Sequence, residues 1–288
     1  MKKGKHTQSS MKHLKEEDFE FFHYKDEVSR YFEFKNHDVY EIFFLISGKV
    51  TYLIEGKSYK MKTGDILLIN SSELHKPVLE SGEIYERIII WIRPDFLYRH
   101  SSEKCDLTLC FNLALDNKHN LIRLNPEMLR TVRNAIVLLE QSCGTSEFGS
   151  HILKNAYLME IIVYLNRYFI SSASNGIELD ISYNEKVDRL LSYINGSLSE
   201  KLTLDNLSAR FFLNKYYLLH EFKKFTGYSL HQYILRKRLI LAKSLLKEGK
   251  QINEVCEECG FGDYSNFIRA FSKAFGVSPK KYYKTDIH

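Results

Sequence analysis

Cysteine is scarce in this chain, and long apolar runs are absent. The five cysteines among 288 residues form a sparse, odd-numbered set, which argues against a disulfide scaffold and for a reducing compartment. No apolar run reaches the length of a membrane-spanning helix, and residues 1–13 contain no hydrophobic stretch of the signal-peptide kind. These absences predict a cytoplasmic protein that has no membrane anchor.

Catalytic signatures are missing as well. No Ser/His/Asp grouping, phosphate-cradling glycine loop or paired-carboxylate motif stands out along the chain. Cys256 and Cys259 have no second Cys or His pair to complete a zinc site, so both thiols are predicted to be small core residues. We therefore expect a protein that is not an enzyme and that needs no cofactor.

Positive charge is concentrated in the last third of the chain. A length of 288 residues favours two domains, each with its own core. Residues 183–288 carry 18 Lys and Arg against 11 Asp and Glu, a net charge of +7, whereas the preceding residues carry 23 against 25. A basic excess of this kind is typical of polyanion binding. On the evidence of charge alone, these residues could equally form an ordinary solvent-exposed surface that binds no polyanion.

The basic part contains one helical pattern that is later repeated. Residues 203–227 predict a short helix, a turn and a second helix. Leu218, Phe222 and Phe225 recur at i, i+4 and i+7, so they share one apolar face. Asn214 stands at the N-cap position of this second helix. A short helix, a tight turn and a capped helix predict a helix-turn-helix.

The same pattern returns about fifty residues later. Residues 252–261 predict a first helix and its turn, and residues 263–275 predict a second helix. Phe267, Phe271 and Phe275 form the apolar stripe of that second helix. Two copies in one chain are an internal repeat, which is a more specific signal than a single helix-turn-helix.

Both copies resemble the DNA-binding module of AraC/XylS-type transcription regulators. The resemblance rests on FKKFTGYS at residues 222–229, a linking helix at 233–246, GFGDYSNFIRAF at 260–271 and FGVSP at 275–279. It covers residues 184–283. The resemblance implies a seven-helix, double helix-turn-helix module, with double-stranded operator DNA as partner. RNA polymerase is a further candidate partner.

The resemblance places base-reading side chains on the second helix of each copy, because a recognition helix presents its outward side chains to base edges. The first set is Tyr216, Leu219, His220 and Lys223, and the second is Tyr264, Ser265, Asn266 and Arg269. Arg269 can form a bidentate pair with guanine, and Asn266 can pair with adenine.

Four further lysines are expected to meet phosphates, which position a protein without reading sequence. They are Lys224, Lys273, Lys280 and Lys281. Leu219 departs from the family pattern, which more often has a polar residue there. Either this leucine contacts a thymine methyl group, or the first recognition helix reads few bases.

Residues 19–100 are rich in aromatic residues and predict short strands. The clearest are residues 40–48, 49–54, 66–70 and 86–92, which are separated by turn signals. Short strands with close turns predict a sandwich or barrel. The string His37, Glu41, Gly48, Gly64-Asp65 and His75 resembles the cupin barrel that precedes the DNA module in many AraC-type regulators. The expected fold class is therefore α+β with two domains.

His37, Glu41 and His75 are the candidate effector-binding residues. The His-x-His of metal-binding cupins is missing, because Asp38 and Val39 follow His37, so no metal is expected. Contact with a small organic effector is the favoured interpretation, and a purely structural role for either histidine is the alternative. Aromatic walls without an Arg/Lys cluster suit a neutral polyhydroxylated ligand, and saccharides are the commonest effectors of the family.

Residues 125–170 have helical periodicity on both sides of a break at residues 143–146. The apolar stripes are Leu129, Val132, Ile136 and Leu139, followed by Leu158, Ile161, Ile162 and Leu165. Two helices joined by a short loop form a hairpin, which in this family is usually the dimerisation element. The alternative is that both stripes cover the barrel.

The expected organisation has five parts. They are a flexible tail at 1–18, a cupin-like barrel at 19–124, a helical hairpin at 125–170, a linker at 171–182 and the DNA-binding module at 183–288. Together they predict a homodimeric transcription regulator that responds to an effector. A cupin metalloenzyme fused to a DNA-binding module and an architectural DNA binder without sequence preference are the alternatives.

Overall fold

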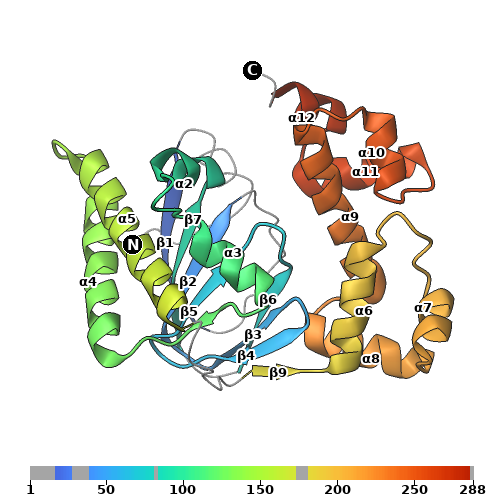
Figure 1. Ribbon diagram of the computed structural model, residues 1–288, viewed down its shortest axis with the longest axis horizontal. Helices are drawn as coiled ribbons and strands as arrows, with labels where there is room; N and C mark the ends of the chain where they lie inside the picture. Colours follow the sequence, from blue (N-terminus) through green and yellow to red (C-terminus); the bar gives the residue numbers. More distant parts are fainter. Residues whose placement is uncertain (1–16, 28–38, 81–83, 173–180, 286–288) are drawn as a thin grey trace. The chain divides into compact units, whose positions relative to one another are not determined.

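The computed structural model describes residues 17–27, 39–80, 84–172 and 181–285. The chain divides into two compact units, and the main boundary lies between Ile181 and Ser182. The first unit contains most of the strands and helices α2 to α5, and the second contains helices α6 to α12 (Figure 1). The predicted two-domain α+β class is confirmed.

The strands form two sheets. One has five strands in the order β1-β7-β2-β5-β8, and the other has four in the order β6-β3-β4-β9. The strands are β1 (Phe19–Glu27), β2 (Tyr40–Ser47), β3 (Val50–Ile54), β4 (Lys57–Lys60), β5 (Ile66–Ile69), β6 (His75–Leu79), β7 (Ile84–Ile92), β8 (Leu121–Ile122) and β9 (Ile181–Tyr183). The predicted strands at 40–48, 49–54, 66–70 and 86–92 are thus confirmed, with ends displaced by one or two residues.

The antiparallel register of the five-stranded sheet gives its two faces different chemistry. Ile90 lies opposite Phe21 and Ile42, whereas the next residue, Trp91, lies opposite Glu20 and Glu41. Because successive side chains of a strand point to opposite faces, the first face is apolar. The second face, here called the inner face, carries carboxylates and aromatic rings.

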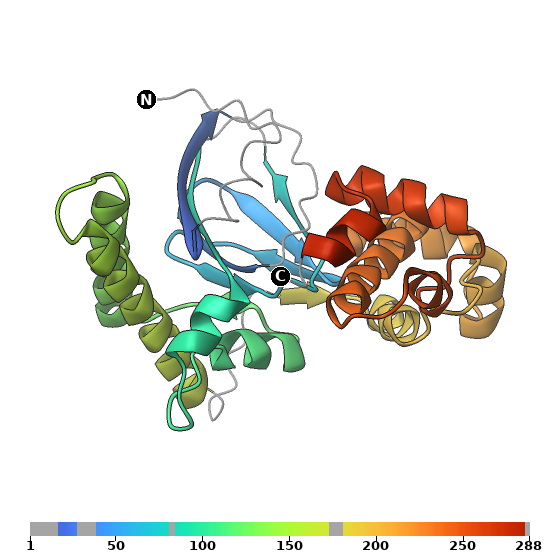
Figure 2. The same cartoon turned by 90° about the horizontal axis from the view of Figure 1, so that it is seen from above.

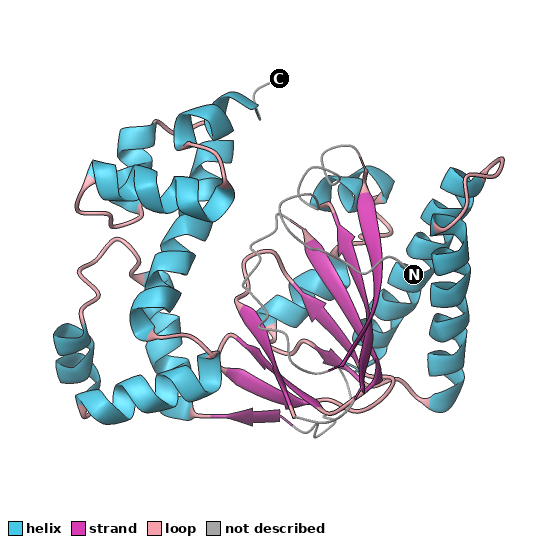
Figure 3. Ribbon diagram, turned by 180° about the vertical axis from the view of Figure 1, so that it is seen from behind, coloured by secondary structure: helices cyan, strands magenta, loops and turns pink. Residues whose placement is uncertain are grey.

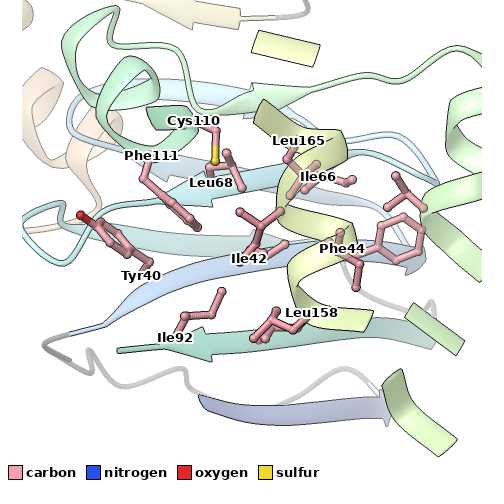
Figure 4. Close-up of a cluster of buried hydrophobic side chains, with 14 of the residues drawn as sticks. Tyr40, Ile42, Phe44, Ile66, Leu68, Ile92, Cys110, Phe111, Leu158 and Leu165 are labelled. Carbon is pink, nitrogen blue, oxygen red and sulfur yellow. The ribbon is translucent and has the colours of Figure 1, made fainter. Parts of the chain in front are cut away.

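Helices cover the apolar face. They are α2 (Pro94–His100), α3 (Leu109–Asp116), α4 (Pro126–Cys143) and α5 (Ser150–Ser172). Figure 4 shows side chains of α3 and α5 packed against the strands, among them Phe111 and Leu158. The rings of Phe111 and Tyr40 are stacked with centroids 4.3 Å apart. Each such fully buried side chain contributes about 1.5–3 kcal/mol of hydrophobic stabilisation.

The predicted helical hairpin is present, and its apolar stripes face the sheet. Asn125 caps α4 by accepting a hydrogen bond from the Met128 amide, and Pro126 occupies the first helical turn. Figure 2 shows α4 and α5 side by side. Val132, Ile136 and the corresponding residues of α5 are buried in the same core as the strands. Those stripes therefore cover the barrel, as the alternative interpretation stated.

The segment around α2, α3 and β8 was not predicted from the sequence. Its β8 strand is attached through Arg123, whose Nε and Nη2 donate to the two carboxylate oxygens of Asp65 at 2.9 and 2.8 Å. Asp65 also accepts a hydrogen bond from the Lys62 amide at 2.7 Å. Asp65, in the Gly64-Asp65 turn of the cupin-like string, thus has a structural role, because it holds the residue that follows β8 against the sheet.

The second unit contains seven helices within residues 182–285, as the family resemblance implied. They are α6 (Glu185–Gly196), α7 (Leu204–Phe211), α8 (Lys215–Thr226), α9 (Leu230–Lys247), α10 (Ile252–Glu258), α11 (Tyr264–Phe275) and α12 (Pro279–Thr285). Figure 3 shows the long helix α9 running between the two helix-turn-helix copies, and it contacts α8, α10, α11 and α12.

Helix α9 begins at a capping box, in which the Ser229 hydroxyl and the Gln232 side chain bond each other's backbone amides. Its Arg238 donates to the carbonyls of Leu198 and Glu200 at 3.0 and 2.7 Å. This motif residue therefore fastens α9 to the loop between α6 and α7. Burial lowers the pKa of its guanidinium.

The thiols of Cys256 and Cys259 are buried in the core around α9, α10 and α11. Burial raises the pKa of both, that of Cys259 to about 12. Buried thiols with raised pKa values are poor nucleophiles and poor metal ligands. The predicted core role of both cysteines agrees with this environment.

Candidate DNA-binding surface and effector site

The first helix-turn-helix is formed by α7 and α8. The Asn214 side chain accepts a hydrogen bond from the Tyr216 amide at 2.8 Å, and Gly227 ends α8 in left-handed backbone with φ of 76°. The predicted stripe, which includes Phe222, is buried. Tyr216, Leu219, His220 and Lys223 are all exposed on the other side of α8. The rings of Tyr216 and His220 stack with centroids 6.2 Å apart.

The second helix-turn-helix is formed by α10 and α11. Asp263 caps α11 by accepting a hydrogen bond from the Asn266 amide at 2.6 Å. Phe267 and Phe271 are fully buried, whereas Tyr264, Ser265, Asn266 and Arg269 are exposed. Arg269 donates to the side-chain oxygen of Asn266. The two residues predicted to read bases are therefore neighbours on one helix face.

The four lysines assigned to phosphates are also exposed. Lys224 lies one turn from Glu221, with 3.7 Å between Nζ and Oε1, and Lys273 lies in the last turn of α11. Lys280 and Lys281 lie in the first turn of α12, where the Lys281 amide donates to the Ser278 hydroxyl at 3.3 Å. Their exposure leaves each ammonium accessible to an anion from solvent.

Glu41, the first candidate effector residue, lies on the inner face of the five-stranded sheet. It is buried, and its Oε2 accepts a hydrogen bond from the indole Nε1 of Trp91 at 2.8 Å. The Trp91 ring meets the ring of Phe22 edge-on, with centroids 4.7 Å apart. A carboxylate is thus held among aromatic rings, and the Trp91 indole is a hydrogen-bond donor to it.

An arginine lies further along the same face. The Nη1 of Arg87 donates to Asp26 at 2.9 Å, and its guanidinium carbon lies 4.2 and 4.9 Å from the ring centroids of Tyr85 and Tyr24. Burial raises the pKa of Tyr24 to about 12. The inner face therefore combines charged groups, hydroxyls and ring faces.

The structure describes one of the two candidate histidines. His37 lies outside the described residues. His75 is the first residue of β6, in the four-stranded sheet, and it is only partly buried. Of the two members of the predicted trio that the structure describes, Glu41 lies on the inner face of the five-stranded sheet.

Sequence reasoning missed Trp91, Arg87 and their partners. A signal was nevertheless present, because Arg87 and Trp91 are four residues apart in a predicted strand. Residues at even spacing along a strand share one face. To predict that Trp91 lies opposite Glu41, the register between the two strands must be known. The sequence alone does not give that register.

Two negative findings concern the described residues alone. In those ranges no group of three or more His, Cys, Asp or Glu side chains is arranged to hold a metal ion. Likewise, no helix among them is both long and apolar enough to cross a membrane.

Comparison with known proteins gives matches to both parts of the chain. Residues 207–285 match a family described as "Helix-turn-helix domain", and residues 22–91 match the "Cupin domain" family. The HTH-type transcriptional activator RhaS of Enterobacter sp. (strain 638) is 25% identical over 251 residues, which cover 85% of each chain.

Solved structures are similar as well. The C-terminal domain of AraT, a response regulator from Geobacillus stearothermophilus, is 31% identical with a TM-score of 0.35, and the match covers 35% of this chain and 86% of that one. Unsaturated fatty acid-bound ToxT from Vibrio cholerae is 18% identical with a TM-score of 0.38, covering 92% and 94%.

Two capped helix-turn-helix copies on a basic stretch, preceded by a cupin domain, define a two-domain helix-turn-helix protein. The matches to the helix-turn-helix and cupin families and to transcriptional activators agree with that class. The chain thus contains a helix-turn-helix domain and a cupin domain, and over most of its length it is similar to an HTH-type transcriptional activator.

Proposed function

We propose that this protein is a cytoplasmic transcription regulator that binds operator DNA through α8 and α11 and that a small organic effector modulates this binding. The observation that supports the proposal most directly is the pair of outward helix faces described above. Both lie opposite buried apolar stripes, and both belong to the part of the chain with a net charge of +7. Each helix then contacts one segment of major groove.

The test is selection of duplexes from a randomised DNA pool by the purified full-length chain. A regulator enriches a conserved sequence, and an architectural binder enriches none. Binding of the selected duplex should exceed binding of a scrambled duplex by at least about a thousandfold at physiological salt. Equal affinities for the two duplexes would overturn the proposal in favour of architectural binding.

The effector is placed on the inner face of the five-stranded sheet, around Glu41. Ligand sites are mostly apolar with a few polar groups that set orientation, and Glu41, Trp91 and Arg87 have these properties here. Carboxylates accept hydrogen bonds from hydroxyls, and ring faces pack on the C–H faces of sugars. A neutral saccharide is therefore the first effector to test.

Dimerisation is assigned to the hairpin, but on its outward side. The predicted stripes are buried within the chain, so they are not available to a second copy. Exposed apolar side chains remain on the other side of α4 and α5 and in their connecting loop. They are Val137, Leu138, Phe148, Ile152 and Leu153. A homodimer formed there would bring four recognition helices to one operator.

An enzymatic role is the less favoured candidate. The inner face supplies Glu41 and the Asp26–Arg87 pair, but the relative compared above is described as an HTH-type transcriptional activator. RNA polymerase is the partner through which bound protein would change transcription. Measurement of turnover with candidate sugars in the presence and absence of divalent metal would separate the two roles.

A further inference from the structure

Among the described residues from 182 to 285, left-handed backbone occurs at glycine with one exception. Within residues 182–285, φ is positive at Gly227, Gly249, Gly260 and Gly276, and it is 52° at Phe212. A side chain with a Cβ is disfavoured in this conformation, whereas glycine adopts it freely. Phe212 therefore stands where the backbone favours glycine.

The two helix-turn-helix turns are closed in the same way. In each turn, the amide of the left-handed residue donates a hydrogen bond to the carbonyl three residues earlier. The amide of the next residue donates to the carbonyl five residues before it. The four bonds are Phe212 N to Ala209 O at 3.3 Å, Leu213 N to Ser208 O at 3.0 Å, Gly260 N to Glu257 O at 2.8 Å and Phe261 N to Cys256 O at 3.0 Å. Phe212 thus occupies the place that Gly260 has in the second copy.

Folding does not account for this phenylalanine. Its side chain is 96% exposed, so the ring gains no burial that would offset the unfavourable backbone. The turn around it is held in place independently, because the Ser208 hydroxyl donates to the Leu213 carbonyl and Lys215 pairs with Asp205. An exposed aromatic ring on a residue with disfavoured backbone conformation costs stability twice. We interpret such a residue as one kept for binding.

The position of Phe212 indicates what it binds. It lies two residues before Asn214, the N-cap of α8, and the first residues of a recognition helix are the ones that contact bases. The exposed face of α8 continues from there with Tyr216, which is 79% exposed, and Leu219, which is 43% exposed. Exposed side chains with large apolar surfaces therefore stand both in the turn and on the recognition helix.

The second copy presents a different surface at the same place. Its turn residue is Gly260, one exposed ring follows at Tyr264, and the next exposed side chains are Ser265, Asn266 and Arg269. These are hydrogen-bonding groups, and Arg269 is already bonded to Asn266. The two copies thus differ in chemistry although their backbones turn alike.

We propose that the first copy reads thymine methyl groups through Phe212, Tyr216 and Leu219, whereas the second reads base edges by hydrogen bonds. The thymine C5-methyl is the apolar group that base pairs present in the major groove. Phe212 is thereby a specificity-determining residue outside the recognition helix. This inference rests on the proposed function, in which α8 enters the major groove.

The test uses a duplex selected by the wild-type protein from a randomised pool, with each thymine replaced singly by uracil. This change removes one methyl group and leaves the base pair intact. The half-site bound by α11 is identified as the one whose preference relaxes in Arg269→Ala. In the other half-site, each contacted methyl that is removed should weaken binding about fourfold.

Phe212→Gly and Phe212→Asn test the residue itself, because both replacements tolerate left-handed backbone. Each variant should bind the thymine duplex less tightly, lose the preference for thymine over uracil at one position, and melt at the same or a higher temperature. Tyr183→Ala is the control, because it removes another ring, 60% exposed, from the second unit. It should bind and discriminate as the wild type does.

The outcomes separate this inference from the proposed function. If the wild type selects no sequence, the proposed function fails. If it selects a sequence but binds uracil and thymine duplexes equally, only the methyl inference fails. Phe212 variants that bind DNA normally but no longer activate transcription would assign the ring to a protein partner and overturn the inference. A lower melting temperature in both variants would assign the ring to folding and overturn it too.

Discussion

Glu41 and Trp91 lie directly opposite each other on neighbouring strands, and the indole Nε1 donates to the carboxylate at 2.8 Å. The chain has one tryptophan, so its fluorescence reports on the inner face of the barrel alone. This pair links a candidate ligand group to an intrinsic probe. It also shows how a residue predicted from a motif acquires its partner through strand register.

The first prediction concerns the effector. Neutral monosaccharides that bind the inner face should change Trp91 emission in the wild type. Glu41→Gln keeps an acceptor for the indole but removes the charge, so the affinity for such a sugar should fall by at least about tenfold.

The earlier histidine hypothesis is tested in the same titration. His37→Ala/His75→Ala should weaken binding if these two side chains contact the effector. Affinities equal to those of the wild type would remove both histidines from the site. A Glu41→Gln variant that bound the sugar normally would place the ligand elsewhere.

The second prediction concerns DNA reading by α11. Arg269→Ala should cost about 1–3 kcal/mol at one base position and relax the preference there. Lys281→Ala is the matched comparison, because it also removes one positive charge. It should weaken binding to all sequences and flatten the dependence of affinity on salt. An unchanged base preference in Arg269→Ala would show that α11 was placed wrongly in the complex.

The third prediction concerns dimerisation. Wild-type protein should sediment as a dimer at micromolar concentration, and Val137→Glu/Ile152→Glu should sediment as a monomer because it places charges on the exposed apolar side of the hairpin. Val78→Glu, which changes an exposed apolar residue of β6, should remain dimeric. A wild type that is monomeric at these concentrations would refute the dimer.

The fourth prediction concerns the fastening of β8. Asp65 is 2% exposed, and its two carboxylate oxygens accept hydrogen bonds from Nε and Nη2 of Arg123. Arg123→Met leaves this buried carboxylate without its cation, which should cost on the order of 3 kcal/mol. Urea unfolding followed by Trp91 fluorescence measures the loss. Asp65→Asn/Arg123→Met should be less destabilised than Arg123→Met, since the buried charge is then gone as well.

The fifth prediction concerns pH. Hydrogen bonds from Lys25 and then from His23, both at 3.0 Å, hold the pKa of Glu86 below its usual range. A carboxylate with a lowered folded-state pKa stabilises the protein above its unfolded pKa of about 4.3, and this stabilisation is lost as pH falls through the lower value.

Glu86→Gln should therefore melt at a lower temperature than the wild type at pH 7, and the difference should shrink as the pH falls below about 4. Lys25→Met should reduce the same pH-dependent difference, because it removes the larger of the two contributions. A difference in melting temperature that is constant from pH 7 to pH 3 would contradict the assignment.

Local signals in the sequence were sufficient for the DNA-binding unit. Caps such as Asn214 and apolar stripes such as Phe267, Phe271 and Phe275 act within one helix, so short-range periodicity predicts both the helix and its outward face. The backbone conformation of Phe212 was not visible at that level. It depends on how the turn closes, and only the structure shows that a phenylalanine has left-handed backbone there.

The barrel illustrates the opposite case. The strand around Glu41 could be predicted from its β-branched and aromatic residues, but the neighbours of Glu41 could not. Trp91 is fifty residues away in sequence and reaches Glu41 only because β7 lies beside β2 in one particular register. The pairing of distant strands is set by the packing of the whole unit, which a local pattern does not encode.

The hairpin lies between these cases. Periodicity alone determined that residues 125–170 form two amphipathic helices, because each apolar stripe repeats within its own helix. What the stripes pack against was decided by tertiary structure. Val132 and Leu158 are buried in one core with the strands, because the apolar face of the sheet must also be covered. The sequence by itself thus determined helices, strands and their polar faces, and tertiary packing determined which face each of them covers.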